Sequence, residues 1–227
     1  MRYLESASAI SFSKVSKQYN EGVPLLENVT FDLKYGELSI LVGPSGSGKS
    51  TILQMASTLV SPDSGEIWIN GKKAKSNVLQ GTFSYVPQED FLFESLSALE
   101  NVRLALEMGR KAPANQEQLA MEALREMGIE SISDRMIDKL SAGERRRVAL
   151  ARGLVRSPGI LIADEPTSSL DLDKTNELLR LLKDRQNKVK KMAILIASHD
   201  VLELAPFADR VYEIKNYTLV EKGSNIA

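Results

Sequence analysis

The sequence predicts an α/β protein with a mostly parallel sheet, because short apolar segments recur along the chain with longer helix-like stretches between them. These segments are rich in Leu, Ile and Val. Strands that helices cover on both faces show this continuous apolar pattern, whereas strands with one exposed face alternate. The predicted parallel strands are residues 38–42, 83–86, 160–163 and 194–197.

A second group of strand-like segments predicts a small antiparallel β subdomain near the N-terminus. Residues 10–15 and 29–33 precede the first parallel strand, and residues 65–71 follow it. The last segment alternates apolar with polar residues and ends in Asn70-Gly71, which is a turn signal.

Residues 91–158 differ from the rest of the chain, because their apolar residues recur at the spacing of amphipathic helices. Gly109 and Pro113 mark the break between two helices. We expect a helical insertion between the second and third parallel strands. The apolar positions are Leu99, Val102, Leu106, Leu119, Ala123, Leu124 and Met127.

The chain has 227 residues, which suits one domain with an inserted subdomain. We expect a single domain over residues 1–227. Its α/β core and β subdomain comprise residues 1–90 and 159–227, and residues 91–158 form the helical insertion.

Composition excludes several kinds of site and partner. The net charge of −1 gives no bulk attraction to nucleic acid, so we expect no nucleic-acid partner. The chain has no cysteine and a single histidine, His199, which excludes thiolate and multi-histidine metal sites. The first six residues lack the apolar run of a secretory signal, and no apolar run approaches the roughly 18 residues of a membrane helix. We therefore expect an intracellular chain that reaches a membrane only by docking to another subunit.

The stretch from Gly43 to Thr51 fits the phosphate-binding pattern G-x-x-x-x-G-K-[ST], between a predicted strand and a predicted helix over residues 50–59. Glycines let the backbone curl so that its N–H groups face inward, and a helix N-terminus adds a positive partial charge. The alternative is a Gly/Ser-rich turn with a chance lysine. In this context the motif predicts a phosphate-loop (P-loop) NTPase of RecA-like fold. Its phosphate-binding residues are Gly43, Ser45, Gly46, Ser47, Gly48, Lys49, Ser50 and Thr51.

Within this loop we expect Lys49 to contact the β and γ phosphates and the Ser50 hydroxyl to bind Mg²⁺. Two carboxylates, Asp164 and Glu165, end the predicted strand 160–163. Asp164 is a candidate Mg²⁺ ligand, and Glu165 is a candidate general base for the attacking water. An acidic pair exposed at a strand end is the alternative.

Four more residues are candidates for the site, and three of them also have a structural interpretation. Asp171 precedes a predicted helix over residues 172–183 and suits an N-cap. Ser141 and Glu144 have the spacing of a capping box for a helix over residues 145–156, and the same geometry makes an anion site. His199 follows a parallel strand at the edge where ligands bind in open α/β sheets.

These pieces, in this order, resemble the nucleotide-binding subunit of the ATP-binding cassette (ABC) transporter family over nearly the whole chain. The phosphate loop is similar to the family's Walker A, and Asp164 with Glu165 is similar to its Walker B. Residues 141–144 resemble the signature motif and residues 168–171 the D-loop. The resemblance implies an ATPase that uses ATP and Mg²⁺.

The resemblance also assigns roles that the residues alone do not. Gln88 matches the Q-loop glutamine, which implies a catalytic role and a place among the metal ligands, while His199 matches the switch histidine. Tyr19 matches the aromatic residue that stacks on adenine. Ser141, Gly143 and Asp171 match residues of the nucleotide site.

This chain departs from the family's Leu-Ser-Gly-Gly-Gln pattern at Ala142 and Glu144. If position 142 requires a positive φ or a close backbone approach, its Cβ costs about 1 kcal/mol. On that condition we expect weakened, not abolished, capture of the γ phosphate.

Family resemblance implies a head-to-tail pair of subunits, which we expect to be a homodimer, in which Ser141 and Gly143 cover the partner's ATP. It also implies that residues 90–102 dock a transmembrane permease subunit at the cytoplasmic face of the cell membrane. Alternatively, Phe91 and Phe93 pack inside the helical insertion. Residues 97–102 look like the branch that exports lipoproteins, macrolides or peptides.

Two other classes of function are alternatives to a transport ATPase. A cell-division regulator of the same family has a similar size, and nothing in the sequence excludes it. A GTPase of the phosphate-loop class usually carries Asn-Lys-x-Asp, but the nearest run, residues 187–190, lacks the aspartate.

Overall fold

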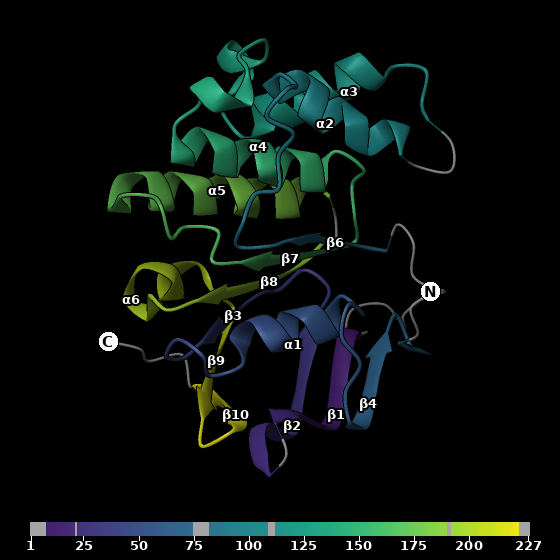
Figure 1. Cartoon of the computed structure of the whole chain (residues 1–227), viewed down its shortest axis with the longest axis vertical. Helices are drawn as coiled ribbons and strands as arrows, with labels where there is room; N and C mark the ends of the chain where they lie inside the picture. The colour runs from purple at the N-terminus through teal and green to yellow at the C-terminus, as the bar shows by residue number, and fades with distance from the viewer. Residues whose placement is uncertain (1–7, 21, 75–81, 109–111, 190–191, 223–227) are drawn as a thin grey trace.

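The computed structural model describes residues 8–20, 22–74, 82–108, 112–189 and 192–222, which form two sheets and the helices around them (Figure 1). The larger sheet has the strand order β10-β9-β3-β8-β7-β6. All its neighbouring pairs are parallel except β9 with β10. The predicted mostly parallel α/β sheet is therefore confirmed. Its strands are β3 (Leu38–Val42), β6 (Phe83–Val86), β7 (Ile160–Asp164), β8 (Ala193–Ser198), β9 (Arg210–Lys215) and β10 (Thr218–Lys222).

The smaller sheet confirms the predicted antiparallel subdomain, with the order β2-β1-β4-β5. Its strands β1 (Ser8–Asn20) and β2 (Val23–Lys34) run well beyond the predicted segments. Register shifts interrupt their pairing at several points, and such bulges break the period-two pattern on which the prediction relied. The other two strands are β4 (Ser64–Ile69) and β5 (Lys72–Lys73).

Three helices follow β6 in the chain and precede β7, as predicted for the insertion: α2 (Ala98–Glu107), α3 (Gln116–Glu126) and α4 (Ala142–Leu154). Two short 3-10 turns, Glu130–Ile132 and Ile137–Lys139, lie between α3 and α4. The predicted break at Gly109 falls outside the described residues, and Pro113 lies in the described part of the α2–α3 connection.

Helices cover both faces of the larger sheet and give the molecule two cores. In Figure 1, α1 (Lys49–Ala56) lies between the two sheets, while α5 (Leu172–Lys188) and the inserted helices lie on the opposite side of the larger sheet. Side chains of β3 divide between these cores: Ile40 packs with the inserted helices, and Leu41 packs with α1 and the smaller sheet. A short helix, α6 (Val201–Leu204), and a 3-10 turn, Ala205–Phe207, follow β8.

Several boundaries differ from the predicted ones. Helix α1 ends at Ala56 because Thr58 has a positive φ of 58°. Helix α4 begins three residues earlier than predicted, directly after its cap at Ser141. Helix α5 continues to Lys188, beyond its predicted end at residue 183.

Among the described residues, no helix is both long enough and apolar enough to cross a membrane. Residues 1–7 are not described, so the expectation for the first six residues has no structural counterpart.

Candidate nucleotide-binding and hydrolysis site

The parallel pairing brings the carboxyl ends of four strands to one edge of the sheet. Val42 at the end of β3 pairs with Ser198 at the end of β8, and Asp164 at the end of β7 pairs with Ala197. β6 pairs with β7 and ends at Val86, two residues before Gln88. The phosphate loop, Gln88, the acidic pair and His199 therefore start from neighbouring strand ends, as expected for ligand sites in open α/β sheets.

The phosphate loop connects β3 to α1 and needs glycine at Gly48. This residue is the N-cap of α1 and has φ 105° and ψ 9°, a conformation that other residues rarely adopt. A Cβ there would also lie 3.0 Å from the Leu26 side chain. The helix therefore starts directly at Lys49, and its free N–H groups face the loop.

Lys49 is a buried cation at the mouth of this loop. Its Nζ donates hydrogen bonds to the main-chain oxygens of Gly43 at 2.8 Å and Pro44 at 3.2 Å. It also lies 3.8 Å from Oε1 of Glu165. A buried charge requires such compensation, and the negative oxygens of a phosphate would replace part of it.

A cavity of about 590 Å³ opens beside this lysine. Ligand sites commonly enclose about 300–1,000 Å³, so a nucleotide-sized ligand fits. The lining combines the loop with three of the predicted catalytic residues, Gln88, Glu165 and His199. The full lining within the described chain is Leu25, Ser45, Gly46, Gly48, Lys49, Ser50, Thr51, Gln88, Glu165, Ser168 and His199.

Glu165 and His199 form a side-chain pair inside the cavity. His199 Nδ1 lies 2.9 Å from Oε2 of Glu165. Glu165 is buried and has a positive φ of 46°, while its N–H donates to the oxygen of Ala197 at 3.0 Å. Strained backbone of this kind persists where the surrounding structure holds it, often at functional sites. The contact orients a carboxylate that can accept a proton from water.

The residues predicted to bind Mg²⁺ lie around a neighbouring cavity of about 620 Å³, whose lining includes Ser50, Gln88 and Asp164. Asp164 is buried, and its Oδ1 has no hydrogen-bond partner among the described residues. Burial raises the pKa of Asp164, and a hydrogen bond with the Ser50 hydroxyl opposes that rise. An unpartnered buried carboxylate oxygen beside a hydroxyl and an amide suits a hard cation, so these residues fit Mg²⁺.

Other predicted nucleotide-binding residues do not line the first cavity in the described chain. Tyr19 is 60% exposed, with Lys17 Nζ 5.4 Å from its ring centroid. Asp171 is the N-cap of α5, where its carboxylate accepts from Lys174 N at 2.9 Å, and this hydrogen bond lowers the pKa of Asp171. Ser141 and Glu144 form the predicted capping box of α4, with Ser141 N donating to Glu144 Oε2 at 2.7 Å. The structural interpretation of both caps is confirmed, and their role at the nucleotide stays a prediction.

Position 142 does not have the positive φ that would make the Cβ of Ala142 costly, so this part of the expectation is wrong. Ala142 is the first residue of α4 and is not among the residues with positive φ. Its Cβ therefore causes no left-handed strain. The close approach occurs one residue later, where a Cβ on Gly143 would lie 2.8 Å from Leu170 Cδ2 in the D-loop segment.

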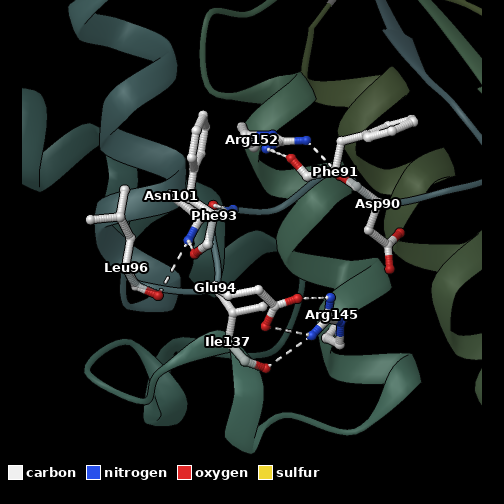
Figure 2. Close-up of polar contacts among 9 residues, drawn as sticks. All are labelled: Asp90, Phe91, Phe93, Glu94, Leu96, Asn101, Ile137, Arg145 and Arg152. Carbon is white, nitrogen blue, oxygen red and sulfur yellow. Dashed lines mark hydrogen bonds and ion pairs between the residues drawn. The ribbon is translucent and has the colours of Figure 1, made fainter.

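The segment that follows Gln88 carries two aromatic residues, Phe91 and Phe93 (Figure 2). Phe91 is 66% exposed and Phe93 is 51% exposed, so the alternative that both pack inside the insertion is wrong. The second half of the proposed docking segment needs correction, because Ser97, Ala98 and Val102 are buried at the start of α2.

Polar contacts fix the main chain of this segment (Figure 2). Arg152 donates to the oxygens of Asp90 at 2.6 Å and Phe91 at 2.7 Å. The buried Asn101 accepts from Phe93 N at 2.8 Å and donates to its oxygen at 3.1 Å. Arg145 forms an ion pair with Glu94 and donates to the oxygen of Ile137 at 3.3 Å. The aromatic rings are thus presented on a backbone that the insertion holds in place.

Sequence reasoning missed these anchoring residues. Asn101 lies on the buried, apolar face of α2. A polar residue on the apolar face of a predicted helix is a sequence signal for a buried hydrogen-bonding role. The charged run from Arg145 to Arg147 looks like a solvated helix surface, so nothing local shows that Arg146 and Arg147 are buried.

A phosphate loop between a buried parallel strand and a helix, with a carboxylate at a neighbouring strand end, defines a phosphate-loop NTPase. The family model described as "ABC transporter" matches residues 26–168. This match covers more than half of the chain, and the chain therefore belongs to the ABC transporter family as an ATP-binding cassette. It is an ATPase that uses ATP and Mg²⁺.

Solved structures of cassettes match most of the chain. The dimeric structure of MJ0796, described as a bacterial ABC transporter cassette, is 31% identical, with a TM-score of 0.85 over 95% of this chain and 99% of that one. A post-hydrolysis dimer of MJ0796 with ADP and Pi is 30% identical, with a TM-score of 0.84 over the same shares. CbiO1 from Clostridium perfringens, part of the transporter complex CbiONQ, is 28% identical, with a TM-score of 0.87 over 97% of this chain and 89% of that one.

Proposed function

We propose that two copies of this chain close head to tail around two ATP molecules and power a membrane transporter by cycles of closure and hydrolysis. The observation that carries this proposal is the division of the predicted site. Lys49, Gln88, Glu165 and His199 converge on one cavity, whereas Ser141 and Gly143 do not line it in the described chain. The MJ0796 cassettes were solved as dimers, which supports the pairing of two copies.

Each residue of the cavity has a defined task in the proposed reaction. The loop N–H groups and Lys49 would bind the phosphates, and Ser50, Asp164 and Gln88 would hold Mg²⁺, which when bound would neutralise charge on the phosphates. Glu165 accepts a proton from water as the water oxygen bonds to the γ phosphorus. The bond between that phosphorus and the β–γ bridging oxygen breaks, giving ADP and phosphate.

His199 holds the Glu165 carboxylate through its Nδ1 contact of 2.9 Å. Phosphate oxygens near Lys49 would draw its ammonium away from Glu165 and leave that carboxylate to the water. We assign Tyr19 to stacking on adenine and Asp171 to the contact between the two copies. Ser141 and Gly143 would cover the γ phosphate bound by the partner copy, with the N-terminus of α4 facing it.

The exposed Phe91 and Phe93 provide the surface for a membrane subunit. A hollow of about 260 Å³ adjoins Phe93 and is lined in part by Leu104, Met108 and Arg152. Apolar and aromatic side chains around a hollow, anchored on rigid backbone, suit a short helix of a partner. We place this cassette on the cytoplasmic face of a membrane through that contact, and the similarity to CbiO1, which is part of the ABC transporter complex CbiONQ, supports this placement.

Isolation of the native complex from membranes tests the transport proposal. We expect a permease-like protein to copurify with the wild-type chain and to be lost from the Phe91→Ala/Phe93→Ala variant. Because both rings are exposed, this variant should keep the wild-type melting temperature and basal ATPase rate. Copurification of a partner that binds a cell-wall hydrolase, with no permease, would instead identify a cell-division regulator.

A further inference from the structure

Arg146 of α4 is a buried arginine that binds the segment around Gln88. The whole residue is 3% exposed, and its Nη1 donates to the main-chain oxygen of Pro87 at 2.6 Å. The same nitrogen lies 3.4 Å from the oxygen of Gln88 and 3.0 Å from Oδ1 of Asp90. Arg146 thus holds the chain on both sides of the Q-loop glutamine.

The other edge of the same guanidinium binds the chain on both sides of Glu165. Its Nη2 donates to the main-chain oxygen of Asp164, and its Nε lies 3.4 Å from the oxygen of Pro166. A guanidinium is planar, with its five N–H donors in a fixed arrangement, so bonds at both edges fix the relative position of the two segments.

Asp90 compensates the buried charge. It forms an ion pair with Arg146 at 3.0 Å, and its side chain is mostly buried. In Figure 2 the Asp90 carboxylate points away from Arg152, which binds only the main-chain oxygen of this residue. A buried ion pair contributes little net stability but defines one arrangement of the groups that it joins.

Resting on the proposed function, we propose that Arg146 is a positioning residue of the ATPase site. It holds the segment that carries Gln88 against the strand end that carries Asp164 and Glu165, so that Gln88 and Asp164 can serve one Mg²⁺. Displacement of reacting or positioning groups by about 1 Å can lower a rate by about 100-fold. Loss of Arg146 should therefore lower the catalytic rate more than the affinity for ATP.

The next residue on the helix supplies a matched control. Arg147 is also buried, at 8% exposed, and its guanidinium also binds a carboxylate and a main-chain oxygen. These partners are Glu177, at 2.7 and 3.0 Å, and Met127, at 3.2 Å, and neither lines the two cavities of the site. Any general loss of stability should affect both variants.

The test compares Arg146→Gln with Arg147→Gln in the full chain by hydrogen exchange and by kinetics. In the nucleotide-free protein we expect Arg146→Gln to speed amide exchange in residues 84–92 by at least about tenfold, and Arg147→Gln to leave it unchanged. In ATPase assays, Arg146→Gln should lower kcat by at least about tenfold and raise the Mg²⁺ concentration for half-maximal rate. Its KM for ATP should stay within about twofold of wild type, because the phosphate loop is untouched.

Equal behaviour of the two variants in exchange and in kcat would overturn the positioning role. If Arg146→Gln does not fold, Asp90→Asn removes one contact and should give the same pattern with a smaller amplitude, and wild-type exchange in that variant would contradict the proposal. A wild-type chain without ATPase activity would refute the proposed function, whereas the exchange comparison would still decide whether Arg146 holds the segment.

Discussion

The phosphate-loop cavity and the N-terminus of α4 are both predicted to bind the same nucleotide, but one chain assembles only the first. Four strand ends bring Lys49, Gln88, Glu165 and His199 to one cavity, and main-chain contacts position them. At α4, the Ser141 hydroxyl instead donates to Glu144 at 2.8 Å within its own cap. We propose that the sheet supplies the chemistry, while the helical insertion supplies a second half-site for another copy.

The largest expected effect is that of Glu165→Gln. The amide cannot accept a proton from water, so the hydrolysis rate should fall by about 100- to 10,000-fold. ATP binding should persist, because the phosphate contacts come from the loop. Single-turnover hydrolysis and calorimetry measure these two quantities, and a hydrolysis rate equal to wild type would end the general-base assignment.

Lys49→Ala should have the next largest effect, on ATP affinity. Removal of a cation that faces the phosphates costs about 1.5–3 kcal/mol, or roughly a 10- to 150-fold higher Kd. Calorimetric titration with ATP measures the change, and Lys73→Ala, which removes an exposed lysine on β5, is the control. Unchanged binding in the Lys49 variant would refute its role.

Asp164→Asn should separate stability from activity. Because burial raises the pKa of Asp164 in the fold, its charged form costs stability as the pH rises through that pKa, whereas below the unfolded pKa the cost is absent. At neutral pH without Mg²⁺ the neutral variant should therefore melt at a higher temperature than wild type, and this difference should vanish at acidic pH. Its Mg²⁺-dependent ATPase activity should fall. A lower melting temperature at neutral pH would contradict the account of the buried carboxylate.

The smallest expected effect is that of Ala142→Gly. Because the Ala142 backbone is helical, no left-handed strain is relieved, and glycine lowers helix stability by about 1 kcal/mol at most. If the exposed methyl hinders closure on the partner's ATP, the ATPase rate should rise. A lower rate would show that this chain has adapted to alanine at that position.

Much of the fold was predictable because it depends on local patterns. A few consecutive residues are enough to recognise the apolar runs of β3 and β8 and the glycines of the phosphate loop. Strands β9 and β10 were not predicted. In β9 the charged Arg210, Glu213 and Lys215 interrupt the apolar residues, and β10 is an edge strand with no buried residue, so neither has the continuous apolar pattern of the predicted strands.

The site was predictable where a motif sits at a strand end and not where distant segments meet. Arg146 contacts Asp90, 56 positions away in the sequence, and its neighbours are also arginines, so no local pattern distinguishes it from a solvated residue. The pairing of His199 with Glu165 likewise depends on β7 and β8 being neighbours. Only the three-dimensional structure identifies these two contacts.

Light scattering on the Glu165→Gln variant tests the division of the site most directly. With ATP and Mg²⁺ the variant should have twice the mass of one chain, and with ADP it should have the mass of a single chain. A single-chain mass at saturating ATP would contradict the claim that each copy completes the other's site.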